Sequence, residues 1–229
     1  MIFVVLLAAF ALITIKSGKL TPTAALAACI TGALVYIGTG YKGITFLGLF
    51  FLLGTWATAH RKSEKSRGQH PQKRTAGQVF ANGGVAAVMG ALAFFFPNYE
   101  ELLLLLVAAS LASATADTLS SELGVLYGKH FYNIVTFRKD VKGLDGVVSL
   151  EGTLLGTAGS FLLAAVYGIT LGLQHHIWII GVAGVAGNLA DSLLGATLER
   201  KNIIGNNAVN FLNTAAAILL AYILFHQTN

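Results

Sequence analysis

Long apolar runs alternate with short polar segments along the whole chain. Most of these runs match the roughly 20 residues that an α-helix needs to cross a bilayer, and the first run is shorter. The pattern predicts eight spans, at residues 1–15, 21–39, 43–59, 78–96, 101–122, 147–172, 176–198 and 206–226. We therefore expect an all-α fold, a polytopic membrane helical bundle of about seven or eight transmembrane helices.

The basic residues predict how the bundle is oriented. When the basic loop at about 60–77 is placed in the cytoplasm and the spans alternate, a second basic loop at about 124–146 lies on the same side. All of the 15 Lys and Arg residues except Lys42 then face the cytoplasm, as the positive-inside rule requires. We expect both termini outside and the active site on the cytoplasmic side, in the plasma (inner) membrane if the organism is prokaryotic.

Composition narrows the class of protein further. Apolar residues make up 55% of the chain and charged residues 11%, against roughly 25% charged in soluble domains. Residues 1–229 are therefore expected to form a single integral membrane domain. The net charge of +5 follows the membrane topology, so we expect no nucleic-acid partner. The single cysteine, Cys29, excludes an intrachain disulfide, and no basic segment of the signal-peptide type precedes the first run.

Two carboxylates lie deep inside predicted spans. Asp117 is 16 residues along a span that begins outside at Glu101, which places it about 24 Å into the bilayer. Asp191 is 15 residues from His176 and reaches a similar depth. Ionisable groups at such positions are costly in lipid and usually serve function. Their matching depth predicts a shared site near the cytoplasmic face.

Other polar residues recur every three or four positions, so each set lies along one face of a helix. The sets are Ser110, Ser113, Asp117 and Ser121; Gly184, Asn188, Asp191, Gly195 and Glu199; Asn206, Asn210, Asn213 and Ala217; and Gln78 with Asn82. Such faces must turn away from lipid, toward a common cavity. Hydrogen bonding between helices is an alternative that accounts for the serines and glycines, but less well for the carboxylates.

The stretch 143–156 leads from a basic loop, through an Asp-Gly turn, into an apolar run. A helix that begins here presents unpaired N–H groups and a partial positive charge, which suit a phosphate. The glycines of the stretch are equally consistent with close packing against a neighbouring helix. Both interpretations stay open at this point.

Clustered carboxylates with hydroxyl and amide groups are oxygen ligands, which suit Mg²⁺ better than zinc. Mg²⁺ usually arrives with substrate phosphates, and basic residues flank the same region. Carboxylates for metal, together with cations and helix ends for phosphate, are the parts of a phosphoryl-transfer site. The chain has no Walker A sequence and no kinase-type glycine-rich loop.

Five motifs occur in an order that resembles a known family. They are Thr75-Ala-Gly-Gln-Val-Phe-Ala-Asn-Gly-Gly84, Ala116-Asp-Thr-Leu-Ser-Ser-Glu-Leu-Gly124, Gly143-Leu-Asp-Gly-Val-Val-Ser-Leu-Glu-Gly-Thr153, Asp191-Ser-Leu-Leu-Gly-Ala-Thr-Leu-Glu199 and Asn207-Ala-Val-Asn-Phe-Leu-Asn213. Together they resemble the DUF92 family of membrane proteins, which includes transmembrane protein 19 of animals and the phytyl-phosphate kinase of plant vitamin E synthesis. The resemblance runs from about Arg74 to the C-terminus and is looser in the first three spans.

The resemblance implies a kinase that transfers a phosphoryl group from a nucleoside triphosphate, CTP in the plant enzyme or else ATP, to a prenyl monophosphate held in the lipid bilayer. It implies that Asp117, Glu122 and Asp191 are catalytic and bind Mg²⁺. The implied nucleotide-phosphate site consists of Lys142, Asp145, Gly146, Ser149, Glu151, Gly152 and Thr153. The residues implied to bind substrate or orient the carboxylates are Asn82, Asn188, Glu199, Asn207 and Asn210. One departure is Lys142-Gly-Leu, where the family often has a Pro-Gly-Thr type lead-in.

Two alternative functions remain. A prenyl-alcohol kinase or a cytidylyltransferase would use the same site. An alcohol nucleophile would need a base, for which Asp117 or Asp191 is available. A transporter would place its charges near the bilayer midplane and often has internal repeats. The short echo between Ala116-Asp-Thr-Leu119 and Ala190-Asp-Ser-Leu193 is consistent with a repeat. A site open only to the cytoplasm favours an enzyme, whereas a path through the bundle favours transport.

Overall fold

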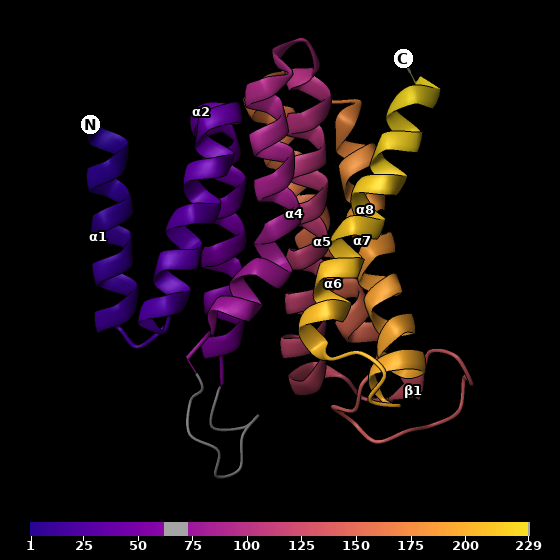
Figure 1. Cartoon of the computed structure of the whole chain (residues 1–229). Coiled ribbons are helices and arrows are strands. Elements are labelled where there is room, and N and C mark those ends of the chain that lie inside the picture. The colour runs from indigo at the N-terminus through magenta and orange to yellow at the C-terminus, as the bar shows by residue number, and fades with distance from the viewer. Residues whose placement is uncertain (62–72, 229) are drawn as a thin grey trace.

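The computed structural model of the protein describes residues 1–61 and 73–228. They form a helical bundle with a short two-stranded hairpin at one end (Figure 1). The elements are α1 (Ile2–Lys16), α2 (Pro22–Ala59), α4 (Ala76–Phe95), the 3₁₀ turn η1 (Pro97–Tyr99), α5 (Glu100–Tyr127), β1 (Tyr132–Asn133), β2 (Val147–Val148), α6 (Leu150–Leu171), α7 (His176–Leu194), the π-helical turn η2 (Gly195–Glu199) and α8 (Asn206–Thr228).

The predicted all-α membrane bundle is confirmed. Six helices of the described chain are long and apolar enough to cross a membrane, and α1 is an apolar helix of 15 residues. Three basic residues of the predicted loop at 60–77, Lys62, Lys65 and Arg67, lie outside the described residues. The span predicted from residue 147 begins as a helix only at Leu150, because Val147 and Val148 pair with β1 instead.

Helix α2 reverses direction at Gly40, which has a positive φ of 60°. A straight helix of its 38 residues would be about 57 Å long. Instead, both of its ends reach Arg74: the Thr21 N–H donates to the Arg74 carbonyl at 3.1 Å, and the Arg74 guanidinium donates to the Thr58 hydroxyl at 3.5 Å. The reversal produces the two spans predicted at 21–39 and 43–59. A glycine suits the turn because L side chains rarely adopt this φ.

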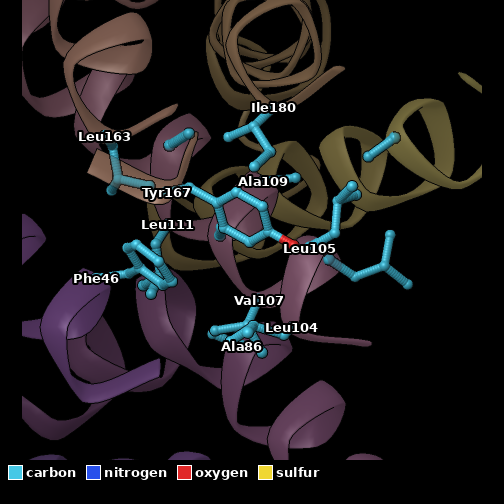
Figure 2. Close-up of a cluster of buried hydrophobic side chains, with 14 of the residues drawn as sticks. Phe46, Ala86, Leu104, Leu105, Val107, Ala109, Leu111, Leu163, Tyr167 and Ile180 are labelled. Carbon is cyan, nitrogen blue, oxygen red and sulfur yellow. The ribbon is translucent and has the colours of Figure 1, made fainter. Parts of the chain in front are cut away.

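Helix α5 is the central helix of the bundle. It packs against α2, α4, α6, α7 and α8, and 83% of its most apolar stretch is buried. Figure 2 shows part of the core around it, in which Leu111 of α5 lies among Phe46, Leu163 and Tyr167 from neighbouring helices. Close packing depends on small residues, since a Cβ added at Gly156 would come within 2.7 Å of the Ala116 carbonyl oxygen. Small residues at helix crossings are typical of membrane bundles.

The bundle has two distinct ends. We call the end that carries residues 17–21, 73–75, 128–149 and 200–205 the loop end. Both chain termini lie at the opposite end (Figure 1), where Lys42 and Glu100 form an exposed ion pair at 3.5 Å. The described basic residues other than Lys42 therefore gather at the loop end. This agrees with the prediction that they lie on the side opposite both termini. Which side of the membrane this end faces stays a prediction.

Candidate active site

A cavity of about 800 Å³ extends from the loop end toward the opposite end of the bundle. Its lining has two different halves. The polar half is built by the start of α4, the second half of α5, the loop before α6, the last turns of α7 with η2, and the start of α8. The apolar half is built by α1, α2 and part of α4. We call these halves the polar chamber and the apolar arm.

Asp117 of α5 and Asp191 of α7 meet in the polar chamber. Both line the cavity, and their carboxyl groups hydrogen-bond to each other. The two helices run in the same direction, so the similar depth predicted from the sequence brings the side chains together. Two carboxyl groups this close either share one proton or, if both are ionised, need a cation between them. The predicted meeting of these residues is confirmed, and their catalytic role stays a prediction.

A hydrogen-bond chain holds Asp191 from behind. Its Oδ1 accepts a hydrogen bond from Nδ2 of Asn213 at 2.7 Å, and Oδ1 of Asn213 accepts one from the Ser113 hydroxyl at 3.1 Å. Ser113 and Asn213 are fully buried. The chain links α5, α7 and α8, so three helices determine how the Asp191 carboxyl is oriented.

The charges of the polar chamber are strongly unbalanced. Its described lining contains five carboxyl groups, Asp117, Glu122, Asp145, Asp191 and Glu199, and one cationic side chain, Arg74. Arg74 is fixed by backbone bonds to Lys19 and Thr21. Burial lowers the pKa of its guanidinium, and the nearby Glu122 acts in the opposite direction. A site with this excess of negative charge attracts divalent cations, and phosphate would need such cations to enter.

Asn82 and Asn188 add amide groups to the chamber. Nδ2 of Asn82 donates to the Gln78 carbonyl at 2.9 Å. Within the described chain, its Oδ1 is buried and has no hydrogen-bond partner. Asn188 lines the cavity from α7, close to the crossing of α6 with α5 at Gly156. The free acceptor on Asn82 can receive a hydrogen bond from a ligand.

The loop before α6 places Asp145 and Ser149 at the chamber. Gly146 has a positive φ of 70°, and a Cβ there would overlap Ala196 in η2. The contact holds the Asp-Gly turn against the end of α7. Ser149 caps α6 by accepting a hydrogen bond from the Gly152 N–H at 3.1 Å. One of the helix N–H groups considered for phosphate is thus already satisfied inside the protein.

The structure does not bring every predicted site residue to the cavity. Asn82, Glu122, Asp145, Gly146, Ser149, Asn188, Glu199 and Asn210 line it together with the two aspartates, whereas Lys142, Glu151, Gly152, Thr153 and Asn207 are outside its lining. Glu151 accepts from the Lys129 N–H at 3.3 Å, and the Thr153 hydroxyl donates to the Ser149 carbonyl at 3.0 Å. Gly152 packs on α5, because a Cβ there would come within 2.9 Å of the Ser120 carbonyl oxygen. The packing interpretation of this glycine is therefore supported.

Asn207 and Lys142 lie nearby but apart from the chamber. Asn207 lines a small separate depression with Thr75 and Gln78. Lys142 extends over the Phe131 ring, with its Nζ 6.0 Å from the ring centroid. Because Phe131 itself lines the cavity, a short movement of the Lys142 side chain would bring its charge to the mouth.

The donor set fits a metal ion that is shared with a substrate. Within residues 1–61 and 73–228, no three His, Cys, Asp or Glu side chains are grouped closely enough to hold a metal alone. Mg²⁺, however, usually takes one or two carboxylates and completes its shell with water and phosphate oxygens. The contacting Asp117–Asp191 pair supplies such ligands. The predicted third ligand, Glu122, lines the same chamber.

Two residues of the site, Asn213 and Arg74, have sequence signals that the predicted set of site residues did not use. Asn213 lies on one helical face with Asn206 and Asn210, whereas Asn207 is one position off that face. The spacing thus contained a signal for Asn213. Arg74 is one of the basic residues that the sequence places beside the predicted site, and membrane topology alone could explain it. Its position directly before the Thr75–Gln78 capping box is the signal that it is held in place.

Comparisons with known proteins agree with this architecture. The family model described as integral membrane protein DUF92 matches residues 5–218. An uncharacterized membrane protein of Methanocaldococcus jannaschii is 34% identical over 224 residues, which cover 97% of this chain and 92% of the relative. The chloroplastic protein VTE6 of Arabidopsis thaliana is 30% identical over 211 residues, or 86% of this chain and 63% of that protein. An uncharacterized membrane protein of Synechocystis is 31% identical over 210 residues, or 88% and 81% of the two chains. No solved structure matches the chain.

Proposed function

Since the chain belongs to the integral membrane protein family DUF92, we propose that it is a prenyl-monophosphate kinase. It would transfer a phosphoryl group from CTP or ATP to a phytyl- or geranylgeranyl-type monophosphate and release the prenyl diphosphate. The family-level support is the resemblance of five motifs to a family that includes the phytyl-phosphate kinase of plants. A chloroplast protein of Arabidopsis thaliana is among the relatives.

The observation that carries this proposal is the junction of two unlike surfaces in one cavity. The polar chamber offers carboxylates, amides and Arg74, and the apolar arm continues from it between α1 and α2. A prenyl phosphate has the same division, with a charged head and a long hydrocarbon tail. The head would lie at Asp117 and Asp191, and the tail would follow the arm.

The reaction requires little covalent chemistry from the protein. An oxygen of the prenyl monophosphate attacks the terminal phosphorus of the nucleotide, the bond from that phosphorus to the bridging oxygen breaks, and the nucleoside diphosphate leaves with the electron pair. No general base is needed, because the attacking phosphate oxygen is already nucleophilic. Mg²⁺, when bound, neutralises charge on the reacting phosphates. Asp117, Asp191 and Glu122 would hold it, and Asn213 would keep Asp191 in position.

The nucleotide would enter from the loop end, which we propose faces the cytoplasm. There Asp145, Gly146 and Ser149 lie at the chamber, and Lys142 stands within a short movement of it. Arg74 would contact a phosphate oxygen on the opposite wall. Asn82 would offer its free amide oxygen to the ribose or to a protonated phosphate.

A prenyl-alcohol kinase is the second candidate, and the carboxyl pair is the observation that favours it. An alcohol must lose a proton as it attacks, and a pair that shares one proton can accept another. The same cavity would hold an alcohol in nearly the same place as a monophosphate. The two candidates differ in the product that forms first.

Purified protein in detergent with Mg²⁺ tests both candidates. It is supplied with CTP or ATP and with either geranylgeranyl monophosphate or the free alcohol, and products are separated and counted. Diphosphate formed from the monophosphate, and absent with Asp117→Asn, supports the kinase proposal and identifies the donor. Monophosphate formed from the alcohol supports the second candidate. Folded protein that yields no product with any pair contradicts both, and transport of prenyl phosphates across proteoliposomes is then the activity to measure.

A further inference from the structure

We propose that the apolar arm is a chain-length gauge, closed at the end opposite the loop end by the rings of Phe3, Tyr36 and Tyr41. The inference rests on the proposed function for the identity of the substrate. It adds which residues determine the longest prenyl chain that the protein accepts.

The arm follows the second segment of α2. Tyr41 and Thr58 both line the cavity, near the two ends of this segment. They are 17 residues apart, which corresponds to about 26 Å along a helix. The cavity as a whole is therefore comparable in length to most of the roughly 30 Å hydrocarbon layer of a bilayer. An extended prenyl chain, and not merely its first isoprene unit, fits such a passage.

The arm lies under α1, at the edge of the bundle. Helix α1 packs mainly against α2, at the left of the molecule in Figure 1. Leu6 and Tyr41 line the cavity and are nevertheless 53% and 54% exposed. The arm is thus separated from lipid by one thin wall, in contrast to the solid core around α5. A tail that arrives from the bilayer has only this wall to pass.

Three aromatic rings stand at the far end of the arm. Phe3 stacks on Tyr36 with ring centroids 3.7 Å apart, and Tyr41 meets Tyr36 edge-on at 5.1 Å. Phe3 also contacts Tyr41, at 6.4 Å. The rings join the start of α1 to the reversal of α2 beside Gly40. A prenyl tail that lies along the arm reaches this cluster last, so the size of the cluster limits the length of the tail.

Gly48 provides a second point of control, halfway along the arm. It lines the cavity, and a Cβ built on it would meet no atom within 4 Å. A side chain there would therefore begin in open space. Gly48 thus leaves the arm open at its midpoint. Phe51, one helical turn further along α2, and Phe10 of α1 also line the arm and contact each other edge to face, with ring centroids 5.0 Å apart.

The test measures turnover of geranyl, farnesyl, geranylgeranyl and geranylfarnesyl monophosphates by the full chain. Gly48→Leu should lower the ratio of kcat/KM for long over short substrates by at least about tenfold, because a blocked pocket discriminates strongly by size. The double variant Phe3→Ala, Tyr41→Ala should shift the preference toward longer chains. Thr45→Leu, at an exposed position of the same segment outside the cavity lining, is the matched control for Gly48. Phe95→Ala, which removes an exposed ring at the same end of the bundle, is the control for the double variant.

Thermal stabilisation of the same variants by the same series of prenyl phosphates separates this inference from the proposed function. An unchanged chain-length profile in Gly48→Leu, with active protein, overturns the gauge and leaves the kinase proposal standing. Stabilisation that rises with chain length and is cut short by Gly48→Leu, without turnover of any substrate, supports the gauge and contradicts the kinase. If neither turnover nor stabilisation is observed with any substrate, both the gauge and the kinase proposal are overturned.

Discussion

Asn213 donates a hydrogen bond of 2.7 Å from its Nδ2 to Oδ1 of Asp191. The Ser113 hydroxyl donates to the amide oxygen of Asn213, which leaves the amide nitrogen for Asp191. Asn213 thus acts on the chamber through another residue. A buried amide with both ends satisfied holds its partner in one orientation.

Replacing Asn213 by Ala should reduce kcat/KM by about 10–100-fold and raise the Mg²⁺ concentration needed for half-maximal rate, since groups that orient a metal ligand have effects of this size. A Mg²⁺ titration of initial rates measures both. Gln227→Ala removes an exposed amide from the other end of α8 and should change neither. Full activity with an unchanged Mg²⁺ requirement in Asn213→Ala would rule out the positioning role.

Asp117→Asn and Asp191→Asn should each abolish turnover and leave the bundle folded. Each change keeps the shape of the side chain and replaces a buried ionisable group with a neutral one, so the melting temperature should stay the same or rise. Glu100→Gln, the same chemical change at the exposed opposite end, should keep normal activity. Loss of folded protein in place of activity would show that the pair is structural.

Removal of divalent cations should change the melting temperature of the protein even when no substrate is turned over. Five carboxyl groups repel one another in the chamber, so Mg²⁺ should raise the melting temperature of the apo protein, and a chelator should reverse the rise. The double variant Asp117→Asn, Asp191→Asn should lose most of this response. An equal Mg²⁺ response in this variant would place the cation elsewhere on the molecule.

The Asp140–Arg200 ion pair predicts a pH dependence of stability. The guanidinium of Arg200 donates to the Asp140 carboxylate at 2.7 Å, and this bond lowers the pKa of Asp140. Folding therefore favours the ionised form. The stabilisation is complete above the ordinary aspartate pKa of about 3.9 and is lost as pH falls through the lowered value.

Asp140→Asn should accordingly lower the melting temperature near neutral pH and flatten the acid limb of its pH profile. Differential scanning fluorimetry across pH 3–7 measures this, and limited proteolysis shows whether the loop between α5 and α6 has loosened. Asp140 is partly exposed, so the effect should be modest. Superimposable profiles for the two proteins would mean that the pair contributes nothing measurable.

Gly146→Ala should destabilise the protein more than Gly143→Ala. Both glycines have positive φ, which costs an L side chain about 1–2 kcal/mol. Only at Gly146 would the new Cβ meet protein, namely Ala196, whereas Gly143 faces open space. The difference between the two free energies of unfolding isolates that contact. Equal values would show that the loop can move away from α7 without cost.

Most of the fold could be predicted from the sequence because lipid imposes a simple requirement. Every backbone group in the hydrocarbon layer must be bonded internally, so apolar runs become helices, and charged gaps become loops. This includes the reversal of α2, which appears in the sequence as a polar break around Tyr41 and Lys42. The β1–β2 hairpin was missed because its pairs, such as Tyr132 with Val148, connect residues on either side of a loop without a strong alternating pattern.

The candidate site was only partly predictable, and the reason differs for its two halves. Carboxylates within apolar runs stand out, so Asp117 and Asp191 could be paired by depth alone. Residues of the apolar arm do not, because a Phe or Leu that faces a cavity has the same composition as one that faces lipid. Only the packing of α1 against α2 distinguishes Phe3 and Leu7, which line the arm, from neighbours that face the membrane.

The central position of α5 has a consequence for how this chain can change during evolution. One half of the helix contributes Leu105 and Leu111 to the solid core, and the other half presents Asp117 and Glu122 to the chamber. A substitution that tilts or shortens this helix therefore alters folding and chemistry at once. Under the proposed function, α1 is the least constrained helix, because its inner face would determine only which tail fits. New substrates could then arise through changes in α1 while the reaction stays the same.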